Sequence, residues 1–278
     1  MSLALQQLFG VQGKVVVITG GGRGIGKMMA DGFVQNGATV YIASRDLDAC
    51  TATATELSAT GPGKCVALQC DLSTEAACKA FAAEIAKRET RVDVLINNSG
   101  AAMGGDFEVH DEAAWDFQLA INVKAPYFLT VALLPLLDTA VDGSARVINV
   151  GSIAGLRTQY LPTMSYDTSK AALHHMTRVL AAKLARRPNG GHILVNAIAP
   201  GHVPSVMSDG VTMALQTTVE AIADGYIPTQ RVGGPQDMAG LAIFLASKAA
   251  GWITGEVIVA DGGQLFATET VMGPSKYL

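Results

Sequence analysis

Tyr166 and Lys170 form a pair of side chains that could perform general acid–base chemistry. They are four residues apart in a segment with helical spacing, so they share one helical face. A lysine ammonium close to a phenol favours the phenolate and moves the phenol's pKa from about 10 toward a useful range. Such pairs also occur by chance on exposed helices. Their value here comes from the other polar residues that precede them, including Ser152 just after a strand candidate.

A glycine-rich stretch at residues 20–26 could bind the phosphates of a nucleotide. It follows a strand candidate, Val15–Thr19, and precedes a helix that opens near Ile25. In that position, the free N–H groups and the positive dipole end of the helix point at a phosphate. Two interpretations fit the spacing: a Walker-type loop that ends at Lys27, or a dinucleotide loop built on Gly20, Gly24 and Gly26.

Met28 argues against the Walker interpretation. A Walker loop places a Ser or Thr hydroxyl after its lysine to hold Mg²⁺, and Mg²⁺ prefers hard oxygen ligands to a thioether. Lys27 is then an ordinary residue of the first helical turn. The strict G-x-G-x-x-G pattern is not satisfied in any register, so the dinucleotide pattern is only approximated. A plain turn between strand and helix is the alternative.

The second strand candidate, Thr39–Ala43, favours NADP(H) over NAD(H). An acid about twenty residues beyond the loop would bind the ribose 2′-hydroxyl of NAD. Ser44 and Arg45 stand there instead, and Arg23 lies within the glycine loop. Two guanidinium groups suit a 2′-phosphate because each donates a planar fork of N–H groups. The alternative is that both arginines are surface charges.

The elements that must position these residues alternate along the chain. The strand candidates are continuously apolar, as expected when both faces of a parallel sheet are buried. Helical spacing between them indicates βαβ units with right-handed crossovers. The pattern predicts an α/β fold, a single doubly wound Rossmann domain with a seven-stranded, mostly parallel sheet and helices on both faces. Besides the two strands given above, the candidates are Lys64–Cys70, Val94–Asn97, Arg146–Val150, Ile193–Ile198 and Glu256–Ala260, and the helices include Lys27–Asn36, Glu75–Arg88 and Tyr166–Arg186.

No linker or low-complexity tract interrupts this alternation, so residues 1–278 are predicted to form one domain. The long irregular segment Gly201–Thr229 is expected to be a substrate lid, because structureless connections of that length are otherwise uncommon. A C-terminal tail is expected at about residues 264–278.

An ordered set of motifs resembles the short-chain dehydrogenase/reductase family over nearly the whole chain. The set consists of the glycine loop, Ser152, the Tyr166–Lys170 pair and several shorter sequence motifs. The combination is specific, although each piece alone is not. The further pieces are Asp71 after the third strand, Asn97-Asn98-Ser99-Gly100, Asn122, Pro200-Gly201, Ile253-Thr254-Gly255 and Asp261-Gly262-Gly263.

The resemblance implies a catalytic role for four residues. Tyr166 would be the general acid that protonates a carbonyl oxygen as hydride arrives from a nicotinamide. Lys170 would lower the pKa of the tyrosine and hold the ribose hydroxyls, and Ser152 would orient and polarise the carbonyl. Asn122 would position a water that links Lys170 to solvent. No metal is expected.

The resemblance also implies a set of residues that contact NADP(H). Asp71 would contact the adenine, Asn98 would lie near the ribose, and Gly201 would help to frame the nicotinamide. Two positions depart from the common pattern: Ser99 stands for an alanine, and Ser205 replaces a cofactor-contacting threonine. The full expected set is Gly20, Gly22, Arg23, Gly24, Ile25, Gly26, Ser44, Arg45, Asp71, Leu72, Asn98, Ser99, Gly100, Tyr166, Lys170, Pro200, Gly201, Val203 and Ser205.

The residues expected to face the substrate are mostly apolar. An adaptable pocket of Met and aliphatic side chains suits a hydrophobic ketone or acyl chain. The overall pattern is similar to that of the family's 3-oxoacyl reductases, including those that act on acyl thioesters. The leading hypothesis is therefore NADPH-dependent reduction of a 3-oxoacyl group or a similar apolar ketone. A polyol or sugar dehydrogenase and a non-catalytic NADPH sensor are the alternatives. The expected lining is Ala101, Ala102, Met103, Ile153, Ala154, Gln159, Tyr160 and the lid from His202 onward, with Val203, Val206, Met207, Val211, Met213, Ala214 and Leu215.

The composition also limits the other kinds of partner that the chain could bind. A net charge of −4 with no long run of Lys or Arg argues against nucleic acid. The most apolar segment, around PYFLTVALLPLL, is too short to span a bilayer and is broken by Pro135, so no membrane partner is expected. Four cysteines without a C-x-x-C pair favour reduced thiols in a cytoplasmic protein. His174 and His175 are interpreted as packing or surface residues. A homodimer or homotetramer, built on the helices around Asn122 and Tyr166–Leu184, follows from the resemblance.

Overall fold

The computed structural model describes residues 3–108, 110–158 and 161–267. Within these residues, seven parallel strands form one sheet in the order β3-β2-β1-β4-β5-β6-β7, which confirms the predicted fold class. The strands differ from their predicted limits by at most two residues at either end. Their bounds are β1 Val15–Thr19, β2 Thr39–Ser44, β3 Lys64–Gln69, β4 Val94–Asn97, β5 Ser144–Val150, β6 His192–Pro200 and β7 Val257–Ala260.

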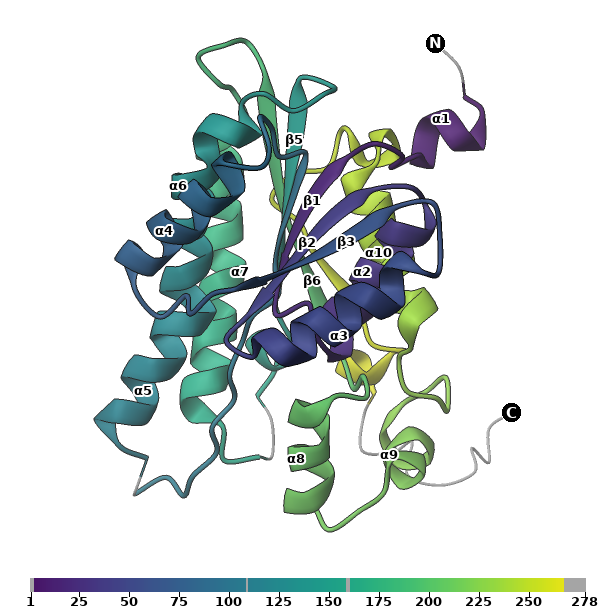
Figure 1. Ribbon diagram of the computed structural model, residues 1–278. Helices are drawn as coiled ribbons and strands as arrows, with labels where there is room; N and C mark the ends of the chain where they lie inside the picture. The colour runs from purple at the N-terminus through teal and green to yellow at the C-terminus, as the bar shows by residue number, and fades with distance from the viewer. Residues whose placement is uncertain (1–2, 109, 159–160, 268–278) are drawn as a thin grey trace.

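Helices cover both faces of the sheet (Figure 1). Helices α2, α3 and α10 pack on one face, and α4, α6 and α7 pack on the other. The α-helices are α1 Leu5–Phe9, α2 Gly24–Gln35, α3 Leu47–Ser58, α4 Glu75–Ala86, α5 Glu112–Leu119, α6 Ala125–Leu137, α7 Met164–Leu184, α8 Val206–Ala214, α9 Val219–Tyr226 and α10 Pro235–Ala246. Shorter turns are the π-helical η1 Ala120–Lys124 and the 3₁₀ turns η2 Ile153–Gly155, η3 Lys248–Ala250 and η4 Gln264–Phe266.

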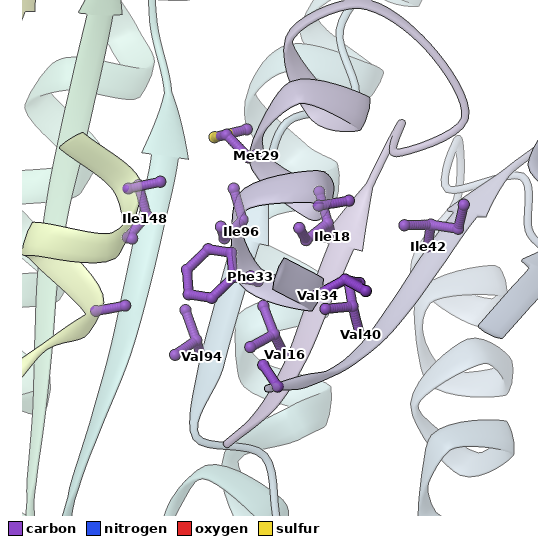
Figure 2. Packing of buried hydrophobic residues seen from close by; sticks show 14 of the residues in the cluster. Val16, Ile18, Met29, Phe33, Val34, Val40, Ile42, Val94, Ile96 and Ile148 are labelled. Carbon is purple, nitrogen blue, oxygen red and sulfur yellow. The ribbon is translucent and has the colours of Figure 1, made fainter. Parts of the chain in front are cut away.

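Strand β1 shows why the strands are apolar without interruption. Val16 and Ile18 point to one face, where they pack in the same cluster as Met29 and Phe33 of α2 (Figure 2). Val15 and Val17 belong to the cluster on the opposite face. Because successive side chains of a strand alternate between faces, a strand covered on both sides must be apolar at every position.

The strand order reverses at β1, which pairs with β2 on one side and with β4 on the other. The connections that leave the carboxyl ends of β1 and β4 therefore go to opposite faces of the sheet. Such a switch point leaves a crevice at the carboxyl ends of the strands, where ligands bind in open α/β sheets. The topology thus puts the glycine loop, which follows β1, beside the Asn98–Gly100 turn, which follows the neighbouring strand β4.

Pro135 was expected to break the most apolar segment, but it lies within α6. Together α5, η1 and α6 form a helical run, Glu112–Leu137, that is long and apolar enough to cross a membrane by length and composition. The core helix of a soluble protein passes the same test. Leu129, Leu133 and Leu137 are fully buried in the cluster between this helix and the sheet, which accounts for the apolar composition.

The segment after β6 corrects a second expectation. Gly201–Thr229 is not irregular, because it contains α8 and α9. Ser205 begins α8 with a reciprocal capping box to Ser208, and Thr218 caps α9 by accepting a hydrogen bond from Ala221. Each cap satisfies an otherwise unpaired N–H group at a helix start. Of the expected C-terminal tail, only residues 264–267 lie within the described residues, and η4 occupies most of them.

Candidate active site

A cleft of about 580 Å³ opens at the carboxyl ends of β1, β2, β4 and β5. It brings together the glycine loop, the end of β2, the Asn98–Gly100 turn and the catalytic helix α7. Fifteen of the nineteen expected cofactor residues line it: Gly20, Gly22, Arg23, Gly24, Ile25, Ser44, Arg45, Asp71, Leu72, Asn98, Ser99, Gly100, Tyr166, Lys170 and Ser205.

The glycine loop is shaped to leave room for a phosphate. Gly20 has a φ of +66°, a conformation that other residues rarely adopt. A Cβ at Gly26 would lie 2.3 Å from the Gly20 carbonyl oxygen, so this glycine allows the start of α2 to approach the end of β1. Arg23, at the N-cap of α2, makes no side-chain cap. The N–H groups of the first turn are therefore left for a ligand, as a dinucleotide phosphate requires.

Arg23 and Arg45 both line the cleft with exposed side chains. Neither guanidinium has an ion-pair partner in the part of the chain that the structure describes. Asp46 follows Arg45 and also lines the cleft, but its carboxylate accepts a 3.0 Å hydrogen bond from the Ala49 N–H at the start of α3. The cleft therefore carries one guanidinium after β2 and another at the start of α2, while the carboxylate next to Arg45 in the sequence caps a helix.

The Asn98 side chain holds the loops together. Its Nδ2 donates to the carbonyl oxygens of Thr19, at 2.9 Å, and Gly20, at 3.1 Å. The Thr19 hydroxyl in turn accepts hydrogen bonds from the backbone N–H groups of Asn98 and Ser99. Asn98 thus ties the end of β1 to the turn after β4, and Thr19 is a partner that the sequence analysis missed.

Asn122 lies behind the cleft in the π-helical turn η1 and is fully buried. Its Oδ1 accepts a 2.9 Å hydrogen bond from the Ala101 N–H, and its Nδ2 donates to the Ala101 carbonyl at the same distance. Nδ2 also donates to the Ser169 hydroxyl. A π-helical turn in an α-helix often marks a functional site. Here it directs Asn122 toward the loop that leads into the cleft.

Ser152, Tyr166 and Lys170 come together as the resemblance implies. Lys170 Nζ donates a 2.8 Å hydrogen bond to the Val150 carbonyl and lies 5.6 Å from the centre of the Tyr166 ring. Ser152 hydrogen bonds to the Tyr166 phenol, which favours the phenolate. Ser152 Oγ also accepts from the Ala154 N–H, so the turn η2 fixes its direction.

The electrostatics of the pair differ from the expectation. Burial raises the pKa of Tyr166 above 10.0, and the hydrogen bond from Ser152 only partly opposes that effect. Burial also lowers the pKa of Lys170 to about 8. Desolvation disfavours both charged groups and outweighs their attraction. The Tyr166 phenol is therefore protonated at neutral pH, which is the form that can donate a proton.

Several expected residues support the cleft without lining it. Val203 is buried, and a Cβ at Gly201 would lie 2.6 Å from the Asp261 Cβ, so this segment is packed against the loop after β7. Ser205 lines the cleft, but its hydroxyl also caps α8. Gln159 and Tyr160 lie outside the described residues. The expected catalytic and cofactor residues that do not line the cleft are Gly26, Asn122, Ser152, Pro200, Gly201 and Val203. The residues expected to face the substrate that do not line it are Ile153, Ala154, His202, Val211, Met213, Ala214 and Leu215.

Other cleft residues were not anticipated. Gln118 is fully buried behind the wall, and its Oε1 accepts a 3.0 Å hydrogen bond from the Met103 N–H. Burial raises the pKa of Cys70 to about 12, so this thiol is protonated. Some of the unanticipated lining residues are next to Arg45, Asp71 or Ser152 in the sequence, and that proximity could have indicated them. The unanticipated lining is Asp46, Ala49, Cys70, Phe117, Ile121, Val150 and Gly151.

Comparison with known proteins agrees with this geometry. A family model described as Enoyl-(Acyl carrier protein) reductase matches residues 20–264. The 3-oxoacyl-(acyl-carrier-protein) reductase of rhamnolipids biosynthesis from Pseudomonas aeruginosa is 41% identical over 257 residues, which cover 92% of this chain and 97% of that protein. The short-chain dehydrogenase/reductase PhomF of Diaporthe leptostromiformis is 33% identical, with 99% of this chain and 98% of that protein covered.

A solved structure, the Pseudomonas aeruginosa RhlG/NADP active-site complex, superimposes with a TM-score of 0.85 at 41% identity. The match covers 93% of this chain and 99% of that one. The expected fold and family resemblance are therefore confirmed over nearly the full length. The chain belongs to the short-chain dehydrogenase/reductase family of nicotinamide-dependent oxidoreductases.

Proposed function

We propose that this chain uses NADP(H) to interconvert a ketone and a secondary alcohol. The glycine loop, the free N–H groups at the start of α2 and the arginines at the cleft edge fit a dinucleotide with a 2′-phosphate. The cofactor, when bound, supplies or accepts the hydride. Arg45 and Arg23 are assigned to the 2′-phosphate, and the Gly20–Gly26 loop to the pyrophosphate.

Proton transfer is assigned to the residues around Tyr166. Its phenol is protonated at neutral pH and donates a proton to the carbonyl oxygen during reduction. Ser152 hydrogen bonds to the same oxygen and fixes the direction of the carbonyl. Lys170 is held beneath both residues by the Val150 carbonyl. Its ammonium group stabilises the phenolate that remains after the proton has left.

The substrate we propose is a 3-oxoacyl group or a similar apolar ketone, and one observation carries this proposal. The outer cleft has carbon-rich walls on two sides: residues 101–103 with Phe117 and Ile121, and the start of α8. Three large apolar side chains that line it remain exposed, as expected of a site for a hydrophobic ligand. They are Met103, Val206 and Met207.

A polyol or sugar substrate is the second candidate, because the same catalytic residues serve many alcohols in one fold. Each buried sugar hydroxyl needs a hydrogen-bond partner, and burial without one is costly. The walls formed by Met103, Val206 and Met207 supply mainly carbon. The apolar walls therefore favour the acyl substrate over the polyol.

A panel of 3-oxoacyl thioesters of increasing chain length, compared with ketoses, tests the substrate class. Each buried methylene contributes about 0.8 kcal/mol, so kcat/KM should rise about fourfold per methylene until the cleft is filled. Met207→Ser should flatten this dependence. Met176→Ser, at a half-buried position on α7 away from the cleft, is the matched control. A ketose preference, or activity independent of chain length, contradicts the acyl proposal.

We also propose that the chain forms a homodimer or homotetramer. Tyr127 and Val131 of α6 and Val179 of α7 are exposed apolar residues on the outer helices. Edge strand β7 is only half-buried, and Trp252 before it is fully exposed. Light scattering coupled to gel filtration should give a multiple of 28.8 kDa. Trp252→Glu and Val179→Glu should each reduce that mass, whereas a monomeric wild type would overturn the proposal.

A further inference from the structure

His174 is a buried histidine directly behind the Ser152 loop. It lies one helical turn after Lys170 on α7, with only 1% of its surface exposed. Its sequence context indicates only a packing or surface residue. In the structure, its Nε2 faces the backbone of the catalytic loop and accepts a hydrogen bond from the Ser152 N–H at 3.5 Å, the long end of the range.

Three consecutive backbone groups of this loop are held from three directions. The Val150 carbonyl accepts from Lys170 Nζ at 2.8 Å. The Gly151 N–H donates to the Ile198 carbonyl of β6 at 2.7 Å. The Ser152 N–H donates to His174. Successive turns of α7 therefore fix the backbone on either side of Gly151, and with it the starting point of the Ser152 side chain.

Gly151 makes room for the imidazole. A Cβ at Gly151 would lie 2.0 Å from His174 Nε2, which is closer than a side-chain carbon approaches another atom, so any side chain there would displace the ring or the loop. A Cβ at Gly155 would lie 2.6 Å from the Lys170 carbonyl carbon and 2.9 Å from His174 Cε1, so this glycine lets the loop approach the backbone of α7 as well as the ring. The loop on both sides of Ser152 is thus packed closely on α7, and at Gly151 it is shaped around His174.

We infer that His174 is a positioning residue for Ser152: its neutral ring accepts the Ser152 N–H and holds the hydroxyl against Tyr166. The inference rests on the proposed ketone reduction, to which it adds a residue that does not touch the substrate. Burial, and then the nearby Lys170 charge, lower the pKa of His174 to about 4. The ring is therefore neutral at working pH, and Nε2 is free to accept.

The test compares His174→Ala and His174→Gln with His175→Ala, an exposed neighbour on the same helix. The alanine variant should lower kcat roughly 10- to 100-fold, since small displacements of catalytic groups have effects of that size. NADPH affinity should stay within about twofold, because His174 does not line the cleft. Glutamine, which retains an acceptor, should restore part of kcat, and His175→Ala should match the wild type.

The decisive readout is a double-mutant cycle with Ser152→Ala, measured in single turnovers with enzyme in excess. If His174 acts through Ser152, His174→Ala should cause little further loss in the Ser152→Ala background. A residue that merely stabilises the fold would cause the same loss in both backgrounds, and that result overturns the inference, as does unchanged kcat in His174→Ala.

Failure of the proposed function would look different. In that case the wild type and the Ser152→Ala variant would turn over no ketone at all. Circular dichroism and NADPH binding establish that each variant is folded. If His174→Ala does not fold, the cycle is carried out with His174→Gln.

Discussion

Lys170 Nζ and the Val150 carbonyl oxygen are joined by a 2.8 Å hydrogen bond that links the catalytic helix α7 to the carboxyl end of β5. Lys170 has little contact with solvent, and burial lowers its pKa from 10.5 to about 8. The bond gives a buried ammonium group an acceptor and keeps its charge beneath Tyr166. The same helix thereby sets the position of Tyr166 and, through β5, that of Ser152.

The lowered pKa of Lys170 predicts a specific pH dependence of stability. Between about pH 8 and 10.5, the unfolded chain binds a proton at this lysine that the folded chain does not. The free energy of unfolding of the wild type should therefore rise with pH in this window, relative to Lys170→Met. Urea denaturation of both proteins at several pH values measures the difference. If the difference in the free energy of unfolding between the wild type and Lys170→Met stays constant or falls as the pH rises, the burial effect is contradicted. Lys183→Met, which removes an exposed lysine on α7, is the control.

Arg45 and Arg23 should set the preference for NADPH over NADH. A hydrogen bond to a charged group contributes about 1.5–3 kcal/mol, so Arg45→Ala should weaken NADPH binding about 10- to 100-fold. NADH binding should change little, because NADH carries no 2′-phosphate. Fluorescence titration measures both affinities. Lys27→Ala is the matched control, since this lysine pairs with Glu56 at 2.8 Å. Undiminished selectivity in Arg45→Ala and Arg23→Ala would show that another group binds the phosphate.

A buried row of polar side chains should stabilise α7 on the sheet. Asn97 Nδ2 donates to Asn149 Oδ1, and Asn149 Nδ2 donates to the Thr177 hydroxyl, each at 2.9 Å. Thr177→Val leaves the Asn149 donor buried without this acceptor, which should cost about 1–3 kcal/mol in the free energy of unfolding. Urea denaturation measures the loss. Thr168→Val, on the exposed side of the same helix, should change stability by less than about 0.5 kcal/mol.

Much of this arrangement could be predicted from the sequence. The mostly apolar runs identified all seven strands, because a parallel sheet buried on both faces leaves few polar positions. The glycine loop, Asn98, Ser152, Tyr166 and Lys170 were placed by their order along the chain. That order determines the site because the ends of parallel strands meet at one edge of the sheet.

The remaining features depend on three-dimensional contacts that spacing does not encode. The segment after β6 looked irregular because α8 and α9 are short and begin at serine and threonine caps. The Tyr166 pKa was expected to fall because its lysine neighbour was visible in the sequence, whereas its burial was not. His174 had no recognisable partner in sequence, because it acts on the backbone of a loop about twenty residues earlier.

Two helical glycines should respond in opposite directions to alanine. Nothing lies within 4 Å of a Cβ built at Gly240 in α10, so Gly240→Ala should stabilise the protein by about 0.5–1 kcal/mol through the lower entropy of the unfolded chain. A Cβ at Gly32 in α2 would lie 2.6 Å from the Ala239 Cβ of α10, so Gly32→Ala should destabilise it. Thermal denaturation distinguishes them. Equal effects would contradict the close packing of α2 on α10.

The most direct test of the account is NADPH oxidation by the wild type and by Tyr166→Phe, across a panel of ketones. NADPH affinity is measured in parallel by fluorescence. Loss of a general acid should lower kcat about 10²- to 10⁴-fold, while NADPH binds both proteins with affinities within about twofold. The contradictory result is equal NADPH binding without tyrosine-dependent turnover of any ketone in the panel. That outcome would identify the chain as a nucleotide-binding sensor that retains the catalytic residues without using them.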